Sequence, residues 1–187
     1  MTSVHPSTVR LFNQALAQLG GEQLSSVEAP WEDSPLGILC VNNFPSILDQ
    51  ALEAHPWSFA RTRMILAEKP RQGFHHRYAL PSDCIRPIEL TGGRPFVING
   101  PDLLTEAAPA ELHYIRRVDD PGAWPPGFRA ALAWGLAAML ATARVNDPRK
   151  QQVFFNQYCL ALSEAMARDN NMQKPKEEPS AWELARC

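Results

Sequence analysis

The chain has 187 residues, of which 45% are hydrophobic and 20% charged, and this composition excludes wholesale disorder. The length allows one domain, or one domain with a small annexe, and a core that needs neither disulfides nor metals. The longest uncharged apolar stretch, residues 130–143, has 14 residues and is too short to span a bilayer. Because residues 1–6 contain no basic or apolar segment, we expect no secretion signal and a soluble, cytoplasmic product.

The formal net charge is −2, but the charges are unevenly distributed. Residues 1–60 contain one arginine and six acids, whereas residues 61–94 contain seven basic and three acidic residues. Nucleic-acid-binding domains are usually basic overall, while patches of opposite sign permit head-to-tail contacts between copies. We therefore predict that neighbouring subunits pair basic residues of one copy with acidic residues of the next. The basic residues are Arg61, Arg63, Arg71 and Arg77, and the acidic residues are Glu28, Glu32 and Asp33.

Two helices are expected within residues 1–56. Apolar residues at helical spacing predict the first over residues 7–19, before two glycines that stop it. A capping side chain directly before Pro35 is typical of a helix start. An apolar stripe then predicts a second helix that ends near Pro56 and is kinked or interrupted by Pro45.

Residues 57–118 favour a β region. Pro87 predicts an edge position for its strand, since proline cannot donate to a ladder. The pair Asn99-Gly100 supplies the positive φ angles of a type I′ hairpin turn. Five extended segments together predict one small, mostly antiparallel sheet: residues 57–60, 77–80, 85–90, 96–104 and 112–118.

Residues 119–172 are expected to return to helix. Between Arg129 and Arg144 the sequence is apolar around the whole helical circumference, so this helix should be buried on all sides. A last helix is expected to start at Pro148 and to end near residues 170–171. Its predicted apolar stripe consists of Phe155, Tyr158, Leu162 and Ala165.

The prediction is an α+β fold. A helical body of about four helices carries an inserted small antiparallel β region and an extended C-terminal tail. The chain lacks an alternating βαβ order, which argues against a doubly wound nucleotide-binding sheet. The predicted divisions are residues 1–56, 57–118, 119–172 and 173–187.

Candidate catalytic and metal-ligating residues are few. His75, His76, His113 and Cys84 have the chemistry of a zinc site, but adjacent histidines point to opposite sides of a strand. Residues 81–84 (PSDC) contain a serine and a cysteine that could act as nucleophiles, but the sequence around them lacks a nucleophile signature. Serine and aspartate directly after a proline are typical of a turn. We therefore predict no catalytic residue, no metal and no cofactor.

The last segment, residues 173–187, alternates charges and prolines and cannot build a core of its own. It is either a frayed end, as chain termini often are, or an arm that becomes ordered on assembly. An aromatic side chain on such an arm would supply binding energy in a partner's groove. The predicted partner-binding residues are Trp182, Leu184 and Arg186.

Six stretches, in chain order, carry a resemblance to one family: residues 15–20 (ALAQLG), 33–36 (DSPL), 55–60 (HPWSFA), 78–86 (YALPSDCIR), 112–115 (LHYI) and 128–138. They resemble the bacteriophage tail tubular protein A family, head-to-tail adaptors that dock on the portal ring, and the likeness covers residues 7–170. The resemblance implies a structural, non-enzymatic virion protein with a helical body and a β-rich projection. Twelve subunits would form a ring between portal and tail.

The same resemblance implies the partners and the location. The partners are the portal protein, a tail or nozzle protein, and double-stranded DNA that passes through the lumen without sequence recognition. The protein would be made in the bacterial cytoplasm and would lie at the head–tail junction of the virion. Two other classes stay open: a small cytoplasmic enzyme or nucleotide-binding domain, and a DNA-binding regulator that uses the basic residues 61–94.

Overall fold

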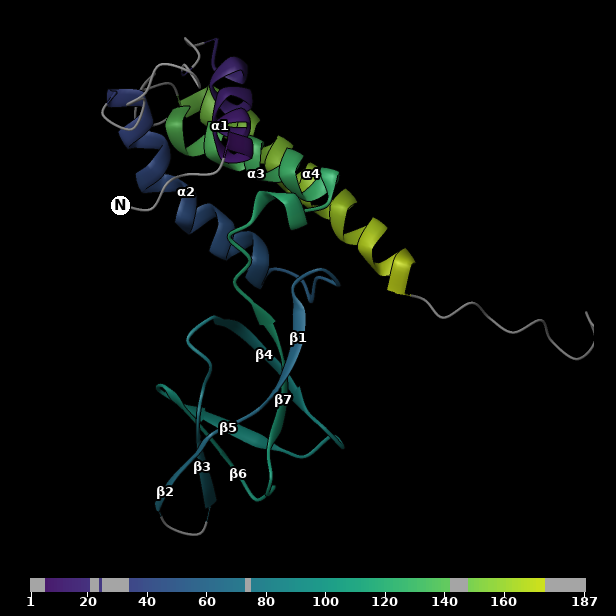
Figure 1. Ribbon diagram of the computed structural model, residues 1–187. Coiled ribbons are helices and arrows are strands. Elements are labelled where there is room, and N and C mark those ends of the chain that lie inside the picture. Colours follow the sequence, from purple (N-terminus) through teal and green to yellow (C-terminus); the bar gives the residue numbers. More distant parts are fainter. Residues whose placement is uncertain (1–5, 21–23, 25–33, 73–74, 142–147, 174–187) are drawn as a thin grey trace, which may run out of the picture.

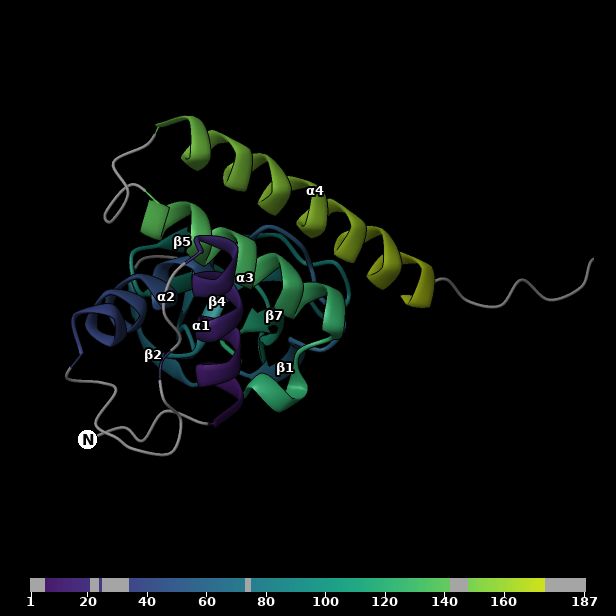
Figure 2. The same ribbon diagram turned by 90° about the horizontal axis from the view of Figure 1, so that it is seen from above.

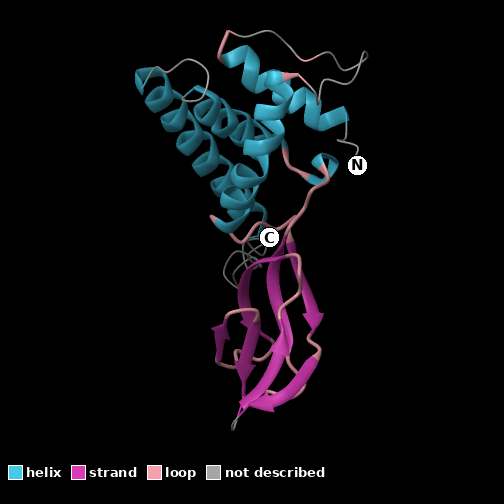
Figure 3. Cartoon of the chain, turned by 90° about the vertical axis from the view of Figure 1, so that its left-hand side faces the viewer, coloured by secondary structure: helices cyan, strands magenta, loops and turns pink. Residues whose placement is uncertain are grey.

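The computed structural model describes residues 6–20, 24, 34–72, 75–141 and 148–173. The fold is α+β, as predicted, with the described helices in a body at one end and the strands in a β region at the other (Figures 1 and 3). The helices are α1 (Pro6–Gln18), α2 (Pro35–Glu53), α3 (Pro126–Leu140) and α4 (Pro148–Gln173), with a short 3-10 turn at Pro121–Ala123. The strands are β1 (Arg61–Ile65), β2 (Glu68–Gln72), β3 (His75–Ala79), β4 (Cys84–Leu90), β5 (Phe96–Asn99), β6 (Asp102–Thr105) and β7 (Glu111–Arg116).

The helical body is organised around α3, which contacts α1, α2 and α4. Figure 2 shows α3 between α1 and the long helix α4. No residue from Ala131 to Leu140 is exposed, so the expected all-round burial of this helix is confirmed. Close approach depends on Gly135, because a Cβ there would lie only 3.0 Å from Ile47 Cγ2 and 3.1 Å from the Tyr158 ring.

Helix α2 starts as the sequence predicts, with Ser34 Oγ accepting a hydrogen bond from the Gly37 amide at 3.0 Å. It continues through Pro45 as one helix, so of the two predicted effects of this proline, a kink or an interruption, the interruption does not occur. Proline removes one backbone hydrogen bond, but the turns that follow it bury Leu48 and Leu52 in the core. This packing keeps the second half of the helix in place.

The β region contains two sheets rather than the one that the sequence suggested. Their strand orders are β1-β7-β4 and β2-β3-β6-β5, and every pair is antiparallel. The chain passes twice from an edge strand of the three-stranded sheet to an edge strand of the four-stranded sheet, from β1 to β2 and from β4 to β5. Side chains of both sheets share one small core. Strand β4 lies at an edge, which confirms the position inferred from Pro87.

The three-stranded sheet lies between the two cores of the molecule. On β7, Leu112 and Tyr114 face the small β core, whereas Ile115 packs into the core of the helical body. The pairing of β4 with β7 shifts register at two places, and the residues skipped there are Ile85 and Ile88. Both pack against the helical core, so the two bulges turn apolar side chains toward the body.

Three local predictions are wrong. Residues 57–60 form a turn instead of a strand, because the Trp57 indole is anchored on the Ala51 carbonyl at 2.7 Å. Phe155 is 50% exposed and lies off the buried stripe of α4. That helix also continues to Gln173, past its expected end.

The β5–β6 hairpin has its turn one residue later than predicted. Asn99 pairs with Asp102, which places Gly100 and Pro101 at the two central positions. Gly100 has φ +59°, whereas the proline ring fixes φ of Pro101 near −65°. A type I′ turn needs positive φ at both positions, so the pattern of a glycine first is that of a type II′ turn.

Candidate functional site

A buried polar cluster connects α4 to the segment between α2 and β1. The Asp169 carboxylate accepts hydrogen bonds from Ser58 Oγ at 2.5 Å and from the Ser58 amide at 3.1 Å. His55 Nε2 lies 3.1 Å from the same carboxylate, and because a carboxylate only accepts, this nitrogen carries the proton. His55 and Asp169 are 7% and 4% exposed, whereas Ser58 is exposed, so the cluster is buried at its centre and reaches the surface at the serine.

The order of these groups decides what they can do. The carboxylate lies between hydroxyl and imidazole, whereas a nucleophilic serine needs the imidazole itself to receive its proton. The His55 ring also meets the Trp57 ring edge-on, with centroids 4.8 Å apart. We therefore interpret the cluster as a clasp that holds α4 against the body, and we call it the Asp169 clasp.

Sequence reasoning missed this clasp, although one signal was present. Asp169 continues the buried stripe of α4 formed by Tyr158, Leu162 and Ala165. A carboxylate on an apolar helix face needs buried partners. The partners themselves, His55 and Ser58, are more than a hundred residues away and belong to a stretch that carried the family resemblance.

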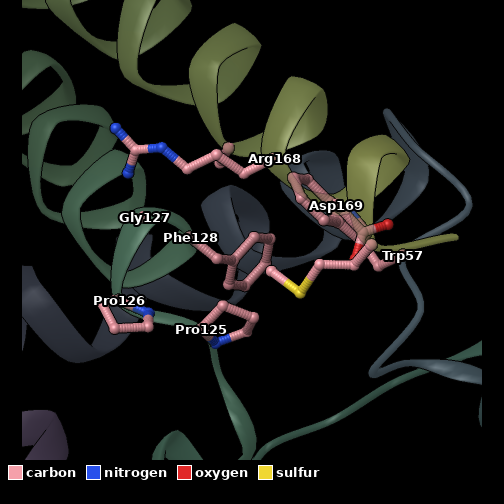
Figure 4. A pocket seen from close by; sticks show the side chains of 9 residues that line it. Trp57, Pro125, Pro126, Gly127, Phe128, Arg168 and Asp169 are labelled. Carbon is pink, nitrogen blue, oxygen red and sulfur yellow. The ribbon is translucent and has the colours of Figure 1, made fainter. Parts of the chain in front are cut away.

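Beside the clasp, a cavity of about 250 Å³ opens between the start of α3 and the last turns of α4 (Figure 4). We call it the α3–α4 pocket. A mostly apolar wall with a few polar groups is the usual form of a binding site. The lining residues are Trp57, Pro125, Pro126, Gly127, Phe128, Ala165, Arg168, Asp169 and Met172.

The structure does not assemble the histidines into a site. His75 pairs with Glu106 at 2.6 Å, and His76 pairs with Glu68 at 2.7 Å. His113 lies on β7 in the other sheet. Over the described part of the chain, no group of three or more potential ligands is close enough to hold a metal ion.

Residues 81–84 form the turn that the sequence predicted, closed by a hydrogen bond from the Cys84 amide to the Pro81 carbonyl at 3.0 Å. Burial, followed by the charge of Asp83, raises the pKa of the Cys84 thiol to about 11. The thiol is therefore protonated at neutral pH and is a weak nucleophile. Asp83 instead accepts a hydrogen bond from the Tyr114 hydroxyl at 3.1 Å, which ties the turn to β7.

The predicted basic interface residues have different surroundings. Arg61 and Arg63 are exposed on the edge strand β1, and Arg63 lies 3.9 Å from Glu111 of the neighbouring strand. Arg77 on β3 donates to Asp102 at 2.7 Å, so its guanidinium is engaged within its own sheet. Arg71 lies on β2. The remaining predicted site residues lie outside the described part of the chain: Glu28, Glu32, Asp33, Trp182, Leu184 and Arg186.

No family model and no curated protein matches the chain. Among the described residues, no helix is both long enough and apolar enough to cross a membrane.

Proposed function

We propose that this chain is a structural virion protein, a head-to-tail adaptor that docks on a portal and joins it to a tail. Copies would form a ring, twelve by the family resemblance, and the ring would extend the channel through which DNA passes. The proposal includes no enzymatic activity and no cofactor. Its location would be the head–tail junction of the virion.

The observation that carries the proposal is the position of the β region. It is inserted between α2 and α3 and projects from the end of the helical body (Figure 3). An adaptor between two different partners needs two chemically distinct ends, and this shape supplies them. The arrangement also agrees with the body and projection that the resemblance implies.

The junction between the two ends is braced, which suits a part that transmits load between partners. Arg117 donates to Asp49 of α2 and to Asp119, both at 2.9 Å. Arg86 of β4 donates to the Glu53 carbonyl at the end of α2 at 3.1 Å. Together with the bulged isoleucines of β4, these contacts favour a fixed orientation of the projection.

Strand β1 is the surface that we assign to the neighbouring subunit. It is an edge strand, and Met64 and Ile65 on it are 51% and 66% exposed beside Arg61 and Arg63. Exposed apolar side chains flanked by charges are typical of protein interfaces. The acidic residues Glu28, Glu32 and Asp33 are the proposed partners in the next copy.

The test mixes the purified protein with the portal ring of the virus or prophage that encodes it, and images the mixture by negative stain. A ring stacked on the portal supports the proposal. A monomer that ignores the portal and retards DNA in a gel would support the regulator instead. A monomer that does neither would also reject the adaptor.

The charge pairing is tested separately by sedimentation of the assembled ring. Raising the salt concentration should dissociate it, because exposed ion pairs are screened by salt. Arg63→Glu should weaken the ring, whereas Arg94→Glu, the same change in the exposed turn after β4, should not. Equal effects of the two substitutions would reject β1 as the subunit interface, but they would not contradict the proposal that the protein forms a ring.

A further inference from the structure

The α3–α4 pocket lies where the described chain ends. Met172 of α4 lines it and is 73% exposed, and α4 ends one residue later at Gln173. Residues 174–187 follow Gln173 directly in the chain. The pocket therefore lies beside the point at which this segment begins.

The wall of the pocket suits a flat aromatic ring. Figure 4 shows Phe128 and Trp57 among its lining residues, Pro125 and Pro126 at the start of α3 on one side, and Arg168 extending across from α4. Its volume of about 250 Å³ exceeds the roughly 150 Å³ that admits benzene in an apolar protein cavity. Guanidinium groups bind favourably over aromatic faces, most strongly over indole.

The sequence that follows α4 contains one aromatic residue, Trp182, and three acids near it, Glu177, Glu178 and Glu183. Trp182 lies nine positions after Gln173, so an extended chain reaches at most about 30 Å, which is ample for a return to the rim. A flexible tether of this length gives an effective concentration in the millimolar range. The acids are complementary in charge to Arg168, which is 65% exposed and makes one exposed i,i+4 contact with Glu164 at 3.3 Å.

We propose that Trp182 of the same chain inserts its indole into the α3–α4 pocket, with Arg168 over the ring and the flanking acids near the guanidinium. This goes beyond the adaptor function, because it concerns the free chain and needs no portal. In an assembling virion, the same segment would leave this pocket and bind the groove of a partner protein instead.

Photo-crosslinking of the full-length chain tests the proposal. Trp182→p-benzoylphenylalanine places a reactive aromatic group at the proposed anchor, and mass spectrometry locates the peptides that it joins. In dilute protein, we expect crosslinks within one chain to the peptides that contain residues 125–128 or 165–172. Crosslinks only between two chains, only to other peptides, or none at all would overturn the proposal.

Two matched substitutions sharpen the test. Met172→Asp puts a charge at the mouth of the pocket and should lower the crosslink yield about tenfold, the change that about 1.4 kcal/mol of binding gives. Leu160→Asp makes the same change at a residue of α4 that is 54% exposed and does not line the pocket, and it should leave the yield unaltered. An equal loss in both variants would reject the pocket as the docking site. Because no portal is present, failure of the adaptor proposal would not affect the result.

Discussion

The helical body buries aromatic and aliphatic side chains around one central helix, whereas the β region builds a smaller core between two sheets. In the body, Phe128 contacts Trp57, Phe59 and Trp124 with ring centroids 4.9, 5.0 and 6.2 Å apart. In the β region, the largest fully buried side chain, Tyr78, keeps its hydroxyl hydrogen-bonded to the Ala107 carbonyl at 3.0 Å. The two cores thus differ in size and in the rings that fill them, while both pair their buried polar groups, as the Trp57 indole does with the Ala51 carbonyl at 2.7 Å.

The two regions also differ in how they satisfy buried charge. The body places one carboxylate, Asp169, among the hydrogen-bond donors of Ser58 and His55 from a distant segment. The β region surrounds Asp102 with two cations from neighbouring strands, Lys69 at 2.5 Å and Arg77 at 2.7 Å. A substitution in one region should therefore reduce the stability of that region more than that of the other. The positions of the tryptophans allow unfolding of the body to be followed separately. All five lie outside residues 61–116, and the three in the described part of the chain, Trp57, Trp124 and Trp134, belong to the core of the body, so their emission reports on the body and not on the strands.

The largest effect is expected from Phe128→Ala. Phe128 is fully buried at the centre of the aromatic cluster, and truncation leaves a cavity that costs about 3–5 kcal/mol of unfolding free energy. Urea unfolding followed by tryptophan emission measures the loss. Leu160→Ala on the exposed face of α4 is the control and should change stability by less than about 0.5 kcal/mol. Similar costs for both variants would show that the aromatic cluster is not the core of the body.

A smaller effect confined to the body is expected from Asp169→Asn. The amide turns an NH₂ group toward the donors of Ser58 or His55, and one unsatisfied buried group costs about 1–3 kcal/mol. Hydrogen exchange should rise in the second half of α4 and stay unchanged in β3 and β6. Ser163→Ala, on an exposed residue of the same helix, is the matched control. Faster exchange throughout the β region would mean that the clasp is not local to the body.

The β region should respond to acid through Asp102. Hydrogen bonds from Lys69 and then Arg77 lower the pKa of this carboxyl below its ordinary 3.8. Since the folded-state pKa is the lower one, the stabilisation is complete above pH 3.8 and is lost as the pH falls from there through the folded-state value. In Asp102→Asn, hydrogen exchange of β3 and β6 should therefore vary less with pH across this window than in the parent. Glu164→Gln, which changes an exposed acid of α4, should keep the pH dependence of the parent.

The helical body could be predicted from the sequence because its information is local. The apolar circumference of α3 and the capping serine of α2 each lie within one helix, and both predictions are confirmed. Strands β1 and β2 gave no such signal. Nearly every residue of β1 is exposed, and β2 has the sequence EKPRQ, so only their pairing with β7 and β3 makes them strands.

The candidate site was less predictable than the fold. The histidines and the 81–84 turn could be recognised in the sequence. In the structure they make separate contacts in the β region and do not form a common site. The Asp169 clasp and the α3–α4 pocket arise where α4 meets the end of α2 and the start of α3. Periodicity within one segment cannot indicate such a meeting, because its members are joined only by tertiary packing.

The smallest effect tests the hairpin in which sequence and structure differ by one residue. Gly100 has φ +59°, a conformation in which a Cβ costs about 1 kcal/mol, so Gly100→Ala should destabilise the chain by about that amount. Asn99 lies in β5, opposite Asp102, and needs no positive φ, so Asn99→Ala should cost clearly less. The type I′ turn expected from the sequence would instead place both residues at positive φ and make Asn99→Ala costly as well. Hydrogen exchange of β5 and β6 in the two variants measures the difference, since no tryptophan reports there. Equal loss of protection in both would restore the Asn99-Gly100 turn, while loss in Gly100→Ala alone would establish Gly100-Pro101.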